Sequence, residues 1–383
     1  MRLPFKARSN MTFLTLLILT AIALWFYGRS LGEPDLAHLD QPRPAPLNAG
    51  APPSAALDEV HARLREMASS GGSFSGKGMA ALRARMDELG ADVPVDDFRI
   101  EPVSAHGVDG EWVRAADSEP DRRLLYLHGG AFTVGSAVSH RRITTELARR
   151  LKVSVLAVNY RLMPEHRRLE GIADCQQGYR FILENGPDGH SAPPTALFVA
   201  GDSAGGSLTL AIIAWARDVG LHPATAAIAL SPTTDSTFNA PSFVANADRD
   251  VMLGPLLKPL LKVPRPIALL MTWLSNRVKP NDPRISPLRG SLAELPPILI
   301  HASEVEMLLD DGARYVAKAQ AAGTDAVLQT WDHMVHVWHI FAPELPEAVA
   351  ALDEIEAFVA RVEALGDRAA DQPADSGLAA AGG

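Results

Sequence analysis

The sequence predicts an α/β fold built on a doubly wound, mostly parallel sheet, and two observations carry this prediction. Short, almost wholly apolar runs without polar alternation are typical of parallel strands that are buried on both faces. Segments with apolar residues at helical spacing alternate with these runs, which indicates helices on both faces of one sheet. The expected strands are 123–127, 153–158, 196–200, 226–230 and 297–302. The expected helices are 139–151, 172–184, 203–219 and 310–322.

The composition of the 383-residue chain is that of a globular protein with a buried core, since 47% of its residues are hydrophobic and 21% are charged. A formal net charge of −9 argues against nucleic acid as a partner, because no basic stripe is available to neutralise phosphates. The single cysteine, Cys175, excludes an intramolecular disulfide. It lies in an expected helix, and we interpret it as a small buried side chain rather than a catalytic thiol.

The N-terminus carries a membrane signal. Three basic residues within 1–8 precede an uncharged run over 9–28, which Arg29 ends. A helix of roughly 20 residues crosses the hydrocarbon layer, and the basic residues ahead of it favour the cytoplasmic side. We therefore expect a cytoplasmic end over 1–8, a transmembrane anchor over 9–28 and the remaining chain outside the cytoplasm. Secretion after cleavage of a signal peptide is the alternative, although no clean small-x-small cleavage site follows the run.

Segments of biased composition flank the expected folded domain, 56–366. Residues 29–55 are rich in Pro, Ala and Gly, which predicts an extended linker, and residues 367–383 have the composition of a disordered tail. Inside the domain, a helical stretch over 57–89 and an apolar, Pro-punctuated stretch over 251–278 interrupt the alternation. We expect both to form a helical cap over the carboxyl ends of the strands, where such sheets bind ligands. The second stretch could also be a crossover helix pair, or contact a membrane surface.

The sharpest local signal is the sequence GDSAGG at 201–206. The strand expected at 196–200 ends directly before it and a helix follows at once, which is the context that a nucleophilic serine requires. In so tight a turn, a side chain at Gly201 or Gly205 would collide with neighbouring backbone. We interpret Ser203 as a nucleophile; the alternative is a serine N-cap after a glycine-rich turn.

The sequence HGGA directly follows the first expected strand. In acyl transfer, backbone N–H groups preset for the developing oxyanion are often the largest catalytic contribution. We expect Gly129 and Gly130 to supply such groups, because glycine tolerates positive φ, together with the N–H of Ala204. His128 is tempting as a general base, but we assign it, with Asp202, to supporting the loops.

The general base is expected near the C-terminus, where WDHMVHVWH contains His333, His336 and His339. Histidines at this spacing could bind a metal. However, no acidic partner with metalloenzyme spacing lies nearby and serine chemistry does not need a metal, so no metal is expected. One of these histidines should take the Ser203 proton. Spacing alone does not choose between His333 and His336.

The acid that orients the base should lie between nucleophile and base in the chain. Glu304, Glu306, Asp310 and Asp311 all follow the last expected strand closely. Asp310 and Asp311 could simply be N-terminal charges of the next helix. A residue close to the end of the strand is better placed to reach a base than one already inside a helix.

With these residues in view, the chain resembles the hormone-sensitive-lipase-like group of α/β-hydrolase esterases over roughly 121–359. HGGAF at 128–132 resembles the oxyanion loop of that group and YRLMPEH at 160–166 its YRLAPEH turn. GDSAGG matches its nucleophile turn, and SPL at 286–288 resembles the element before its acid strand. Such a set in the family's order is far more specific than any one motif.

The resemblance implies the α/β-hydrolase fold and catalysis without a cofactor. It also implies Glu306 as the orienting acid, with Asp310 as the helix-side acid, and His336 as the base. Three departures are visible. Ala131 replaces the commoner third glycine, a glutamate replaces the commoner aspartate as the acid, and RRLE at 167–170 replaces the Pro and small residues often seen there.

We therefore expect a serine carboxylesterase or lipase that forms an acyl-enzyme on Ser203 and hydrolyses a small-molecule or lipid ester, anchored to a membrane through its N-terminal helix. An N-acyl or acetyl deacylase of the same fold is an alternative. A catalytically inactive binding module is a third hypothesis, from another class. The sequence does not indicate acyl-chain length, the alcohol portion or the oligomeric state.

Overall fold

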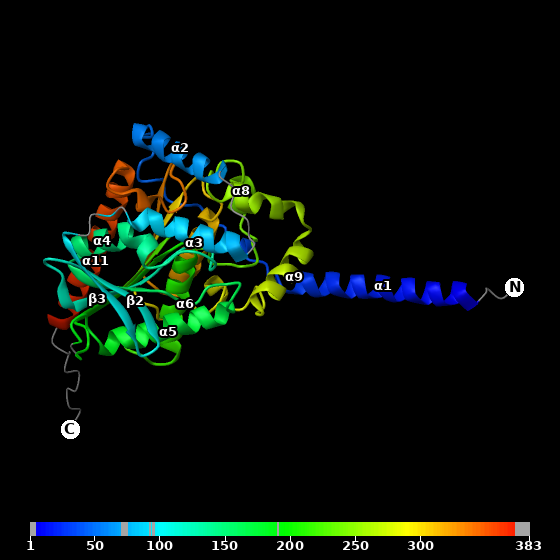
Figure 1. Ribbon diagram of the computed structural model, residues 1–383, viewed down its shortest axis with the longest axis horizontal. Helices are drawn as coiled ribbons and strands as arrows, with labels where there is room; N and C mark the ends of the chain where they lie inside the picture. Colours follow the sequence, from blue (N-terminus) through cyan, green and yellow to red (C-terminus); the bar gives the residue numbers. More distant parts are fainter. Residues whose placement is uncertain (1–4, 70–75, 92, 94–95, 190, 372–383) are drawn as a thin grey trace, which may run out of the picture.

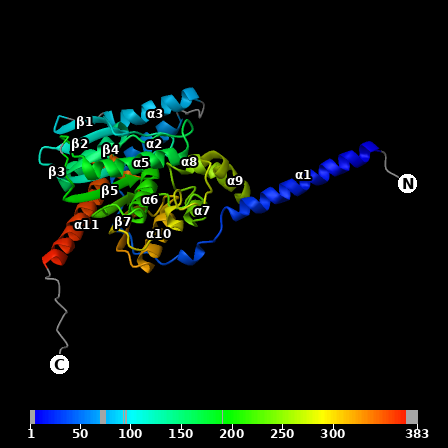
Figure 2. The same ribbon diagram turned by 90° about the horizontal axis from the view of Figure 1, so that it is seen from below.

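The computed structural model describes residues 5–69, 76–91, 93, 96–189 and 191–371. Across these residues an 8-stranded sheet runs in the order β1-β2-β4-β3-β5-β6-β7-β8, with helices on both of its faces (Figures 1 and 2). The strands are β1 Phe98–Ala105, β2 Val108–Ala115, β3 Glu119–Leu127, β4 Val153–Val158, β5 Ala196–Asp202, β6 Ala226–Leu230, β7 Ile298–Ser303 and β8 Ala326–Trp331.

The predicted mostly parallel sheet is confirmed, because β3 to β8 pair in parallel and only β2 pairs antiparallel, with both β1 and β4. The predicted strands 153–158 and 226–230 coincide with β4 and β6. Strands β1, β2 and β8 were not predicted. They carry charged or polar residues between apolar ones, and β1 is largely exposed at the edge of the sheet, so none of them forms the continuous apolar run of a buried parallel strand.

The four predicted crossover helices are present, with α5 beginning four positions earlier than 172 because Arg167–Glu170 forms a capping box. Two buried clusters lie on opposite faces of the sheet. One contains side chains of α5, α6 and α10, and the other side chains of α4 and α11. These helices are α4 Arg141–Leu151, α5 Arg168–Glu184, α6 Ala204–Asp218, α10 Leu309–Ala321 and α11 Pro346–Asp371.

Both segments expected to form a cap contain helices. The first forms α2 Ala55–Ser69 and α3 Gly76–Ala91. The second forms α8 Gly254–Leu257, the 3-10 helix Lys258–Lys262 and α9 Arg265–Asn276, after the short helix α7 Ser242–Ala245. From α3, Arg83 donates hydrogen bonds to the carbonyl oxygens of Thr133 and Met163. These two carbonyls belong to the loops after β3 and β4, so α3 lies at the carboxyl ends of the strands.

The predicted transmembrane anchor is not supported. Its residues lie in α1 Phe5–Ser30, which projects away from the domain in both views (Figures 1 and 2). Over the part of the chain that the structure describes, none of the helices combines the length and apolar character needed to cross a membrane. The last turns of the predicted span are also taken up by protein, because Tyr27 packs edge-on against Trp273 at 5.4 Å and Gly28 abuts the backbone of Pro266.

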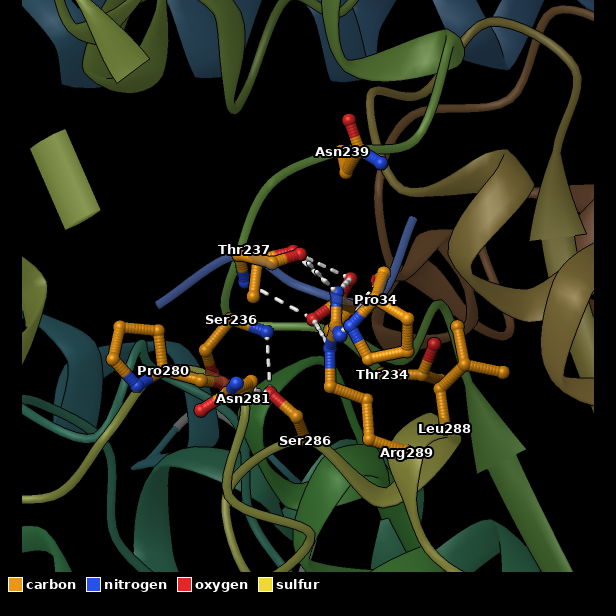
Figure 3. Close-up of polar contacts among 12 residues, drawn as sticks. Pro34, Thr234, Ser236, Thr237, Asn239, Pro280, Asn281, Ser286, Leu288 and Arg289 are labelled. Carbon is orange, nitrogen blue, oxygen red and sulfur yellow. Dashed lines mark hydrogen bonds and ion pairs between the residues drawn. The ribbon is translucent and has the colours of Figure 1, made fainter. Parts of the chain in front are cut away.

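The expected linker, 29–55, lies along the domain and is bonded to it at several points. Its first part is held by Arg289, which donates to the carbonyl oxygen of Pro34 while pairing with the buried carboxylate of Asp235 (Figure 3). Further along, Asp40 pairs with the buried Arg314 at 2.6 Å. These contacts hold the end of α1 beside α9. Of the expected disordered tail, residues 367–371 form the end of α11 and 372–383 lie outside the described residues.

Candidate active site

Ser203 lies on a sharp turn between β5 and α6. Its backbone has φ 51° and ψ −113°, a sparsely populated conformation for a residue with a side chain, of the kind that clusters at functional sites. The turn requires glycine at two positions, because a Cβ there would collide with neighbouring backbone. A Cβ at Gly205 would overlap the carbonyl oxygen of Leu127, and a Cβ at Gly201 would lie 2.5 Å from the same atom. The predicted collision with neighbouring backbone is therefore confirmed.

The structure brings Ser203, His336 and Glu306 together in one chain of hydrogen bonds. Ser203 Oγ lies 2.9 Å from Nε2 of His336, and Nδ1 of the same ring lies 2.7 Å from Oε2 of Glu306. The second carboxylate oxygen of Glu306 accepts the N–H of Ser303 at 2.8 Å. Both oxygens of this fully buried carboxylate are thus bonded, and one of them sets the orientation of the imidazole.

The electrostatics of this chain of hydrogen bonds favour the charged form of the His336 imidazole. Burial by itself lowers the pKa of His336, but the hydrogen bond and the negative charge of Glu306 outweigh burial and raise the pKa above its ordinary value. A ring that takes a proton from the serine therefore becomes an imidazolium beside a carboxylate. This is the arrangement in which a general base is most effective.

The other carboxylates that the sequence left open as the orienting acid have other partners. Among the acids, Asp310 pairs with Arg43 and accepts the N–H of Ser242, and Glu304 also pairs with Arg43. Asp311 accepts the N–H of Thr234. None of these three carboxylates is bonded to a histidine among the described residues.

The other two histidines of the C-terminal stretch face different surroundings from His336. His339 is buried with its Nε2 3.0 Å from Nδ1 of His301, and burial, followed by the nearby His301, lowers its pKa well below the ordinary value. His333 lines a cavity beside the base. The three rings do not converge on one point, and over the described residues no group of metal-binding side chains is arranged to hold an ion.

The oxyanion loop is tied to the nucleophile turn by Asp202. Oδ1 of this buried carboxylate accepts the N–H of Gly129 at 2.9 Å and the hydroxyl of Tyr126 at 2.7 Å. The Gly129 N–H is therefore not free for an oxyanion, contrary to our expectation, because a donor already bonded to a buried carboxylate has no second proton to offer. Within the described part of the chain, no hydrogen bond engages the N–H of Gly130, Ala131 or Ala204.

The loop itself is in a left-handed conformation. Gly130, Ala131 and Phe132 have φ of 107°, 52° and 62°. For the glycine this costs little, whereas a residue with a Cβ is strained there. The departure from a third glycine at position 131 therefore carries a strain that the surrounding hydrogen bonds must hold.

His140 completes the support of this loop and was not predicted. Its Nε2 lies 3.3 Å from Oδ2 of Asp202. Burial lowers the pKa of His140, but the charge of Asp202 outweighs it and raises the pKa above the ordinary value. No local sequence signal marks His140, which begins a helix in an unremarkable stretch; only its contact with the residue before the nucleophile reveals its role.

His128 braces the loop without contacting the nucleophile. Its ring stacks on Tyr160 at 4.2 Å, its Nδ1 lies 2.7 Å from the carbonyl oxygen of Gly129, and its own carbonyl accepts the Tyr160 hydroxyl at 2.6 Å. Burial and then the neighbouring His140 lower its pKa to about 3. A ring that is neutral and stacked in this way holds the loop in place, and Tyr160 comes from the YRLMPEH turn noted in the sequence.

Arg168 is a second residue that sequence reasoning missed. Its guanidinium is buried 3.7 Å above the ring of Phe132 and donates to Ser236 Oγ and to the carbonyl oxygen of Ile285, each at 3.2 Å. Burial lowers its pKa to about 9. The residue lies in the RRLE departure at 167–170, so this departure places a cation under the oxyanion loop.

A cavity of about 280 Å³ lies beside the base. Met334 and Val335, which directly precede His336, form part of its wall, and most of the remaining wall comes from α2 and from the loop before α8, with Pro53 and Val305. The two segments expected to form a cap thus meet around this cavity. Its lining residues are Pro53, Leu57, Asp58, His61, Arg249, Asp250, Val251, Val305, His333, Met334 and Val335.

Comparison with known proteins agrees with this geometry. Residues 124–340 match the family model described as alpha/beta hydrolase fold. An acetyl-hydrolase of Streptomyces hygroscopicus is 35% identical over 65% of this chain and 78% of its own length, and an esterase of Acinetobacter venetianus is 31% identical over 74% and 89%. The crystal structure of an esterase from the bacterial hormone-sensitive lipase family superposes with a TM-score of 0.70 at 34% identity, covering 80% of this chain and 97% of the other.

The chain therefore belongs to the α/β-hydrolase family. Within that family, the resemblance to the hormone-sensitive-lipase-like esterases is confirmed. The protein is a carboxylic ester hydrolase.

Proposed function

We propose that the protein hydrolyses carboxylic esters through an acyl-enzyme on Ser203, with His336 as the general base and Glu306 as the acid that orients it. The observation that carries the proposal is the unbroken hydrogen-bonded chain from Ser203 Oγ through His336 to Glu306, with steps of 2.9 and 2.7 Å. The strained backbone of Ser203 supports the same role, since it presents the hydroxyl at the end of the sheet.

In the first half of the reaction, Ser203 Oγ attacks the ester carbonyl carbon while its proton passes to Nε2 of His336. The tetrahedral intermediate carries a negative charge on the former carbonyl oxygen. We infer that the N–H groups of Gly130, Ala131 and Ala204 face this charge, because they lie in the loop after β3 and directly after the nucleophile and have no hydrogen-bond partner among the described residues. The imidazolium then returns its proton to the departing alcohol oxygen, which leaves the acyl group on Ser203.

In the second half, water takes the place of the alcohol. His336 accepts a proton from the water as the water attacks the acyl-enzyme carbonyl, and returns it to Ser203 Oγ as the acid departs. Glu306 remains ionised throughout and stabilises the imidazolium in both halves. No cofactor takes part in this sequence.

We infer that the cavity beside His336 holds the alcohol portion of the ester. The departing alcohol receives its proton from the base, and Met334 and Val335, which directly precede the base in the chain, form part of the wall of this cavity. Asp58, His61 and Arg249 give this cavity a polar lining, which favours alcohol portions that carry hydroxyl or other polar groups. Comparison of kcat/KM for glycerol esters and for simple alkyl esters of one acid tests this inference; a preference for alkyl alcohols would contradict it.

Two measurements on one variant test the nucleophile. Ser203→Ala should leave the far-UV circular dichroism and the thermal unfolding unchanged, abolish hydrolysis of p-nitrophenyl butyrate and abolish labelling by a fluorophosphonate probe. Ser275→Ala, which alters an exposed serine on α9, is the matched control and should keep both activities. Turnover or labelling that persists in Ser203→Ala would refute the assignment.

A deacetylase of the same chemistry is the second candidate, because one relative is named an acetyl-hydrolase. The same acyl-enzyme forms from an acetyl ester or an N-acetyl group, but an amine is a poorer leaving group than an alcohol. Parallel kinetics with acetyl esters and N-acetyl compounds distinguish the two candidates, and a series of acyl-chain lengths defines the acid portion.

A further inference from the structure

A group of exposed apolar side chains gathers on the insertion between β6 and β7. Ile267, Met271 and Leu274 lie at positions i, i+4 and i+7 of α9 and therefore on one face of that helix, with exposed fractions of 42%, 52% and 54%. On the preceding turns Leu256 is 59% exposed and Leu260 is 37% exposed. Large apolar side chains left exposed in this number on one short segment indicate an interaction surface.

The same segment is strongly basic in an acidic protein. The stretch 251–281 contains five Lys or Arg residues and no Asp or Glu, although the whole chain has a net charge of −9. All five are exposed, and among the described residues only one of them, Lys258, forms a salt bridge, with Asp248. Arg265 lies on the opposite side of α9, against Gly32. The other four basic residues and the exposed apolar side chains form what we call the apolar–basic surface; its members are Leu256, Leu260, Ile267, Met271, Leu274, Lys258, Lys262, Arg277 and Lys279.

Among the residues that the structure describes, the apolar members of this surface are left exposed. The opposite side of α9 is already occupied, since Pro266 and Leu269 are buried and Trp273 packs against Tyr27 of α1. The last turns of α1 meet α9 at the end of the domain from which α1 projects (Figures 1 and 2). The last turns of α1 add Trp25 and Phe26, which are 43% and 64% exposed, so the apolar character continues beyond α9.

We propose that the apolar–basic surface rests on an anionic lipid surface. Apolar side chains enter the boundary between head groups and acyl chains, and exposed lysines and arginines attract anionic head groups, which is the combination that holds a helix in the plane of an interface. Charge complementarity decides between occupants: a second copy paired through the same surface would bring two basic surfaces together, which repel, whereas anionic lipid attracts them, and the apolar residues alone would not require the basic ones. This contact lies along the membrane surface and requires no helix to cross it.

The position of the apolar–basic surface relates the lipid contact to the cavity beside the base. Its segment begins at Val251, which lines the cavity beside His336. A domain that rests on lipid through this segment keeps the entrance of the cavity close to the interface, where lipid esters are concentrated. The contact itself does not depend on the chemistry of Ser203, so the two proposals are tested separately.

Site-specific fluorescence on the full-length protein tests the contact. Met271→Cys labelled with an environment-sensitive fluorophore reports on the surface, and Val219→Cys, at a comparable exposure of 49%, is the matched control elsewhere on the domain. The natural Cys175 is fully buried and should not react. Both variants also carry Ser203→Ala, so that hydrolysis of lipid does not change the vesicles.

With vesicles of phosphatidylcholine and phosphatidylglycerol, emission at position 271 should shift to the blue and be quenched by brominated acyl chains, while position 219 should not respond. Adding Lys262→Gln and Arg277→Gln should raise the vesicle concentration at half-maximal shift about 25-fold, at roughly fivefold for each removed charge. Pure phosphatidylcholine vesicles should act far more weakly.

Three results would overturn the proposal. Position 271 could remain in water at all vesicle concentrations, or position 219 could respond as strongly as position 271. Alternatively, a shift at position 271 that grows with protein concentration in the absence of vesicles would show that a second copy of the chain covers this surface.

Discussion

Glu306→Gln is the substitution that isolates the charge of the orienting acid. The glutamine has nearly the same volume, and its amide oxygen can still accept the N–H of Ser303, which Glu306 accepts at 2.8 Å. What the variant lacks is a negative charge 2.7 Å from Nδ1 of His336. Its amide nitrogen can also donate to the ring, which favours the wrong tautomer for accepting the Ser203 proton.

The size of the loss follows from the distance. At an effective dielectric constant of about 20, opposite unit charges 2.7 Å apart attract by roughly 6 kcal/mol. In the active form of the free enzyme the ring is neutral and the imidazolium forms only in the transition state and the intermediates, so most of this attraction lowers the barrier rather than the energy of the active free enzyme. We expect kcat to fall about 10³- to 10⁴-fold, which corresponds to about 4 to 5.5 kcal/mol, with little change in KM.

The pH profile gives a second readout with a definite sign. In the native enzyme, the hydrogen bond and charge of Glu306 outweigh burial and raise the pKa of His336. Activity requires the neutral ring, so the acid limb of kcat/KM should lie above the ordinary histidine value of about 6.5. Without the carboxylate, burial dominates and the pKa falls; the acid limb of Glu306→Gln should therefore move to lower pH while its plateau drops.

The assay is the hydrolysis of p-nitrophenyl butyrate between pH 5 and 9, after correction for the pKa of p-nitrophenol. Glu304→Gln, which removes a carboxylate two positions away that pairs with Arg43, is the matched control and should keep at least half of the activity. Glu306→Asp keeps the charge and should recover part of the loss. A Glu306→Gln enzyme with nearly native kcat, or with an acid limb moved to higher pH, would refute the reasoning.

Three further predictions concern stability, each measured by urea denaturation. Burial, and next the charge of Asp235, raise the pKa of Asp311 to about 7. The protonated form of Asp311 therefore stabilises the fold below about pH 4, and this stabilisation is lost as the pH rises to 7, by at most about 1.4 kcal/mol per pH unit. Asp311→Asn should flatten this dependence of the free energy of unfolding on pH, and an unchanged slope would contradict the assignment. Asp202→Asn removes the partner of His140 and should lower the free energy of unfolding by about 3 kcal/mol at pH 6. Gly205→Ala should prevent folding to the native state because its Cβ overlaps backbone, whereas Gly366→Ala, in open space on α11, should stabilise by about 1 kcal/mol.

Several elements of this protein could be predicted from the sequence because their signals are local. The apolar runs at β4 and β6 coincide with the strands, since a parallel strand that is buried on both faces must be apolar throughout. The turn at Ser203 was predicted for the same reason: its glycines and flanking elements are adjacent in the chain. The edge strand β1 and its antiparallel neighbour β2 lack such a signal, because charged residues lie between their apolar ones.

The hydrogen-bond partners of the oxyanion-loop amides could not be predicted from the local sequence. Glycine composition suggested that the N–H of Gly129 would be free, but Asp202, 73 positions away, accepts it. The role of His140 has the same origin, as does the position of Arg168 beneath Phe132. Each depends on which loops meet at the carboxyl ends of the strands, and no pattern within a single loop records that meeting.

By itself, the sequence determined the parallel α/β sheet and the position of the candidate nucleophile, because both depend on residues that are neighbours in the chain. Tertiary structure alone decided which amides of the loop remain free and how the 29–55 segment lies against the domain. It also brought against His336 the carboxylate of Glu306, which local spacing had left among four candidates and only the family resemblance had singled out. It also put the end of α1 against α9, where the sequence had predicted a membrane span. These features join segments far apart in the chain, and their energies depend on distances and burial that exist only once the sheet has brought those segments together.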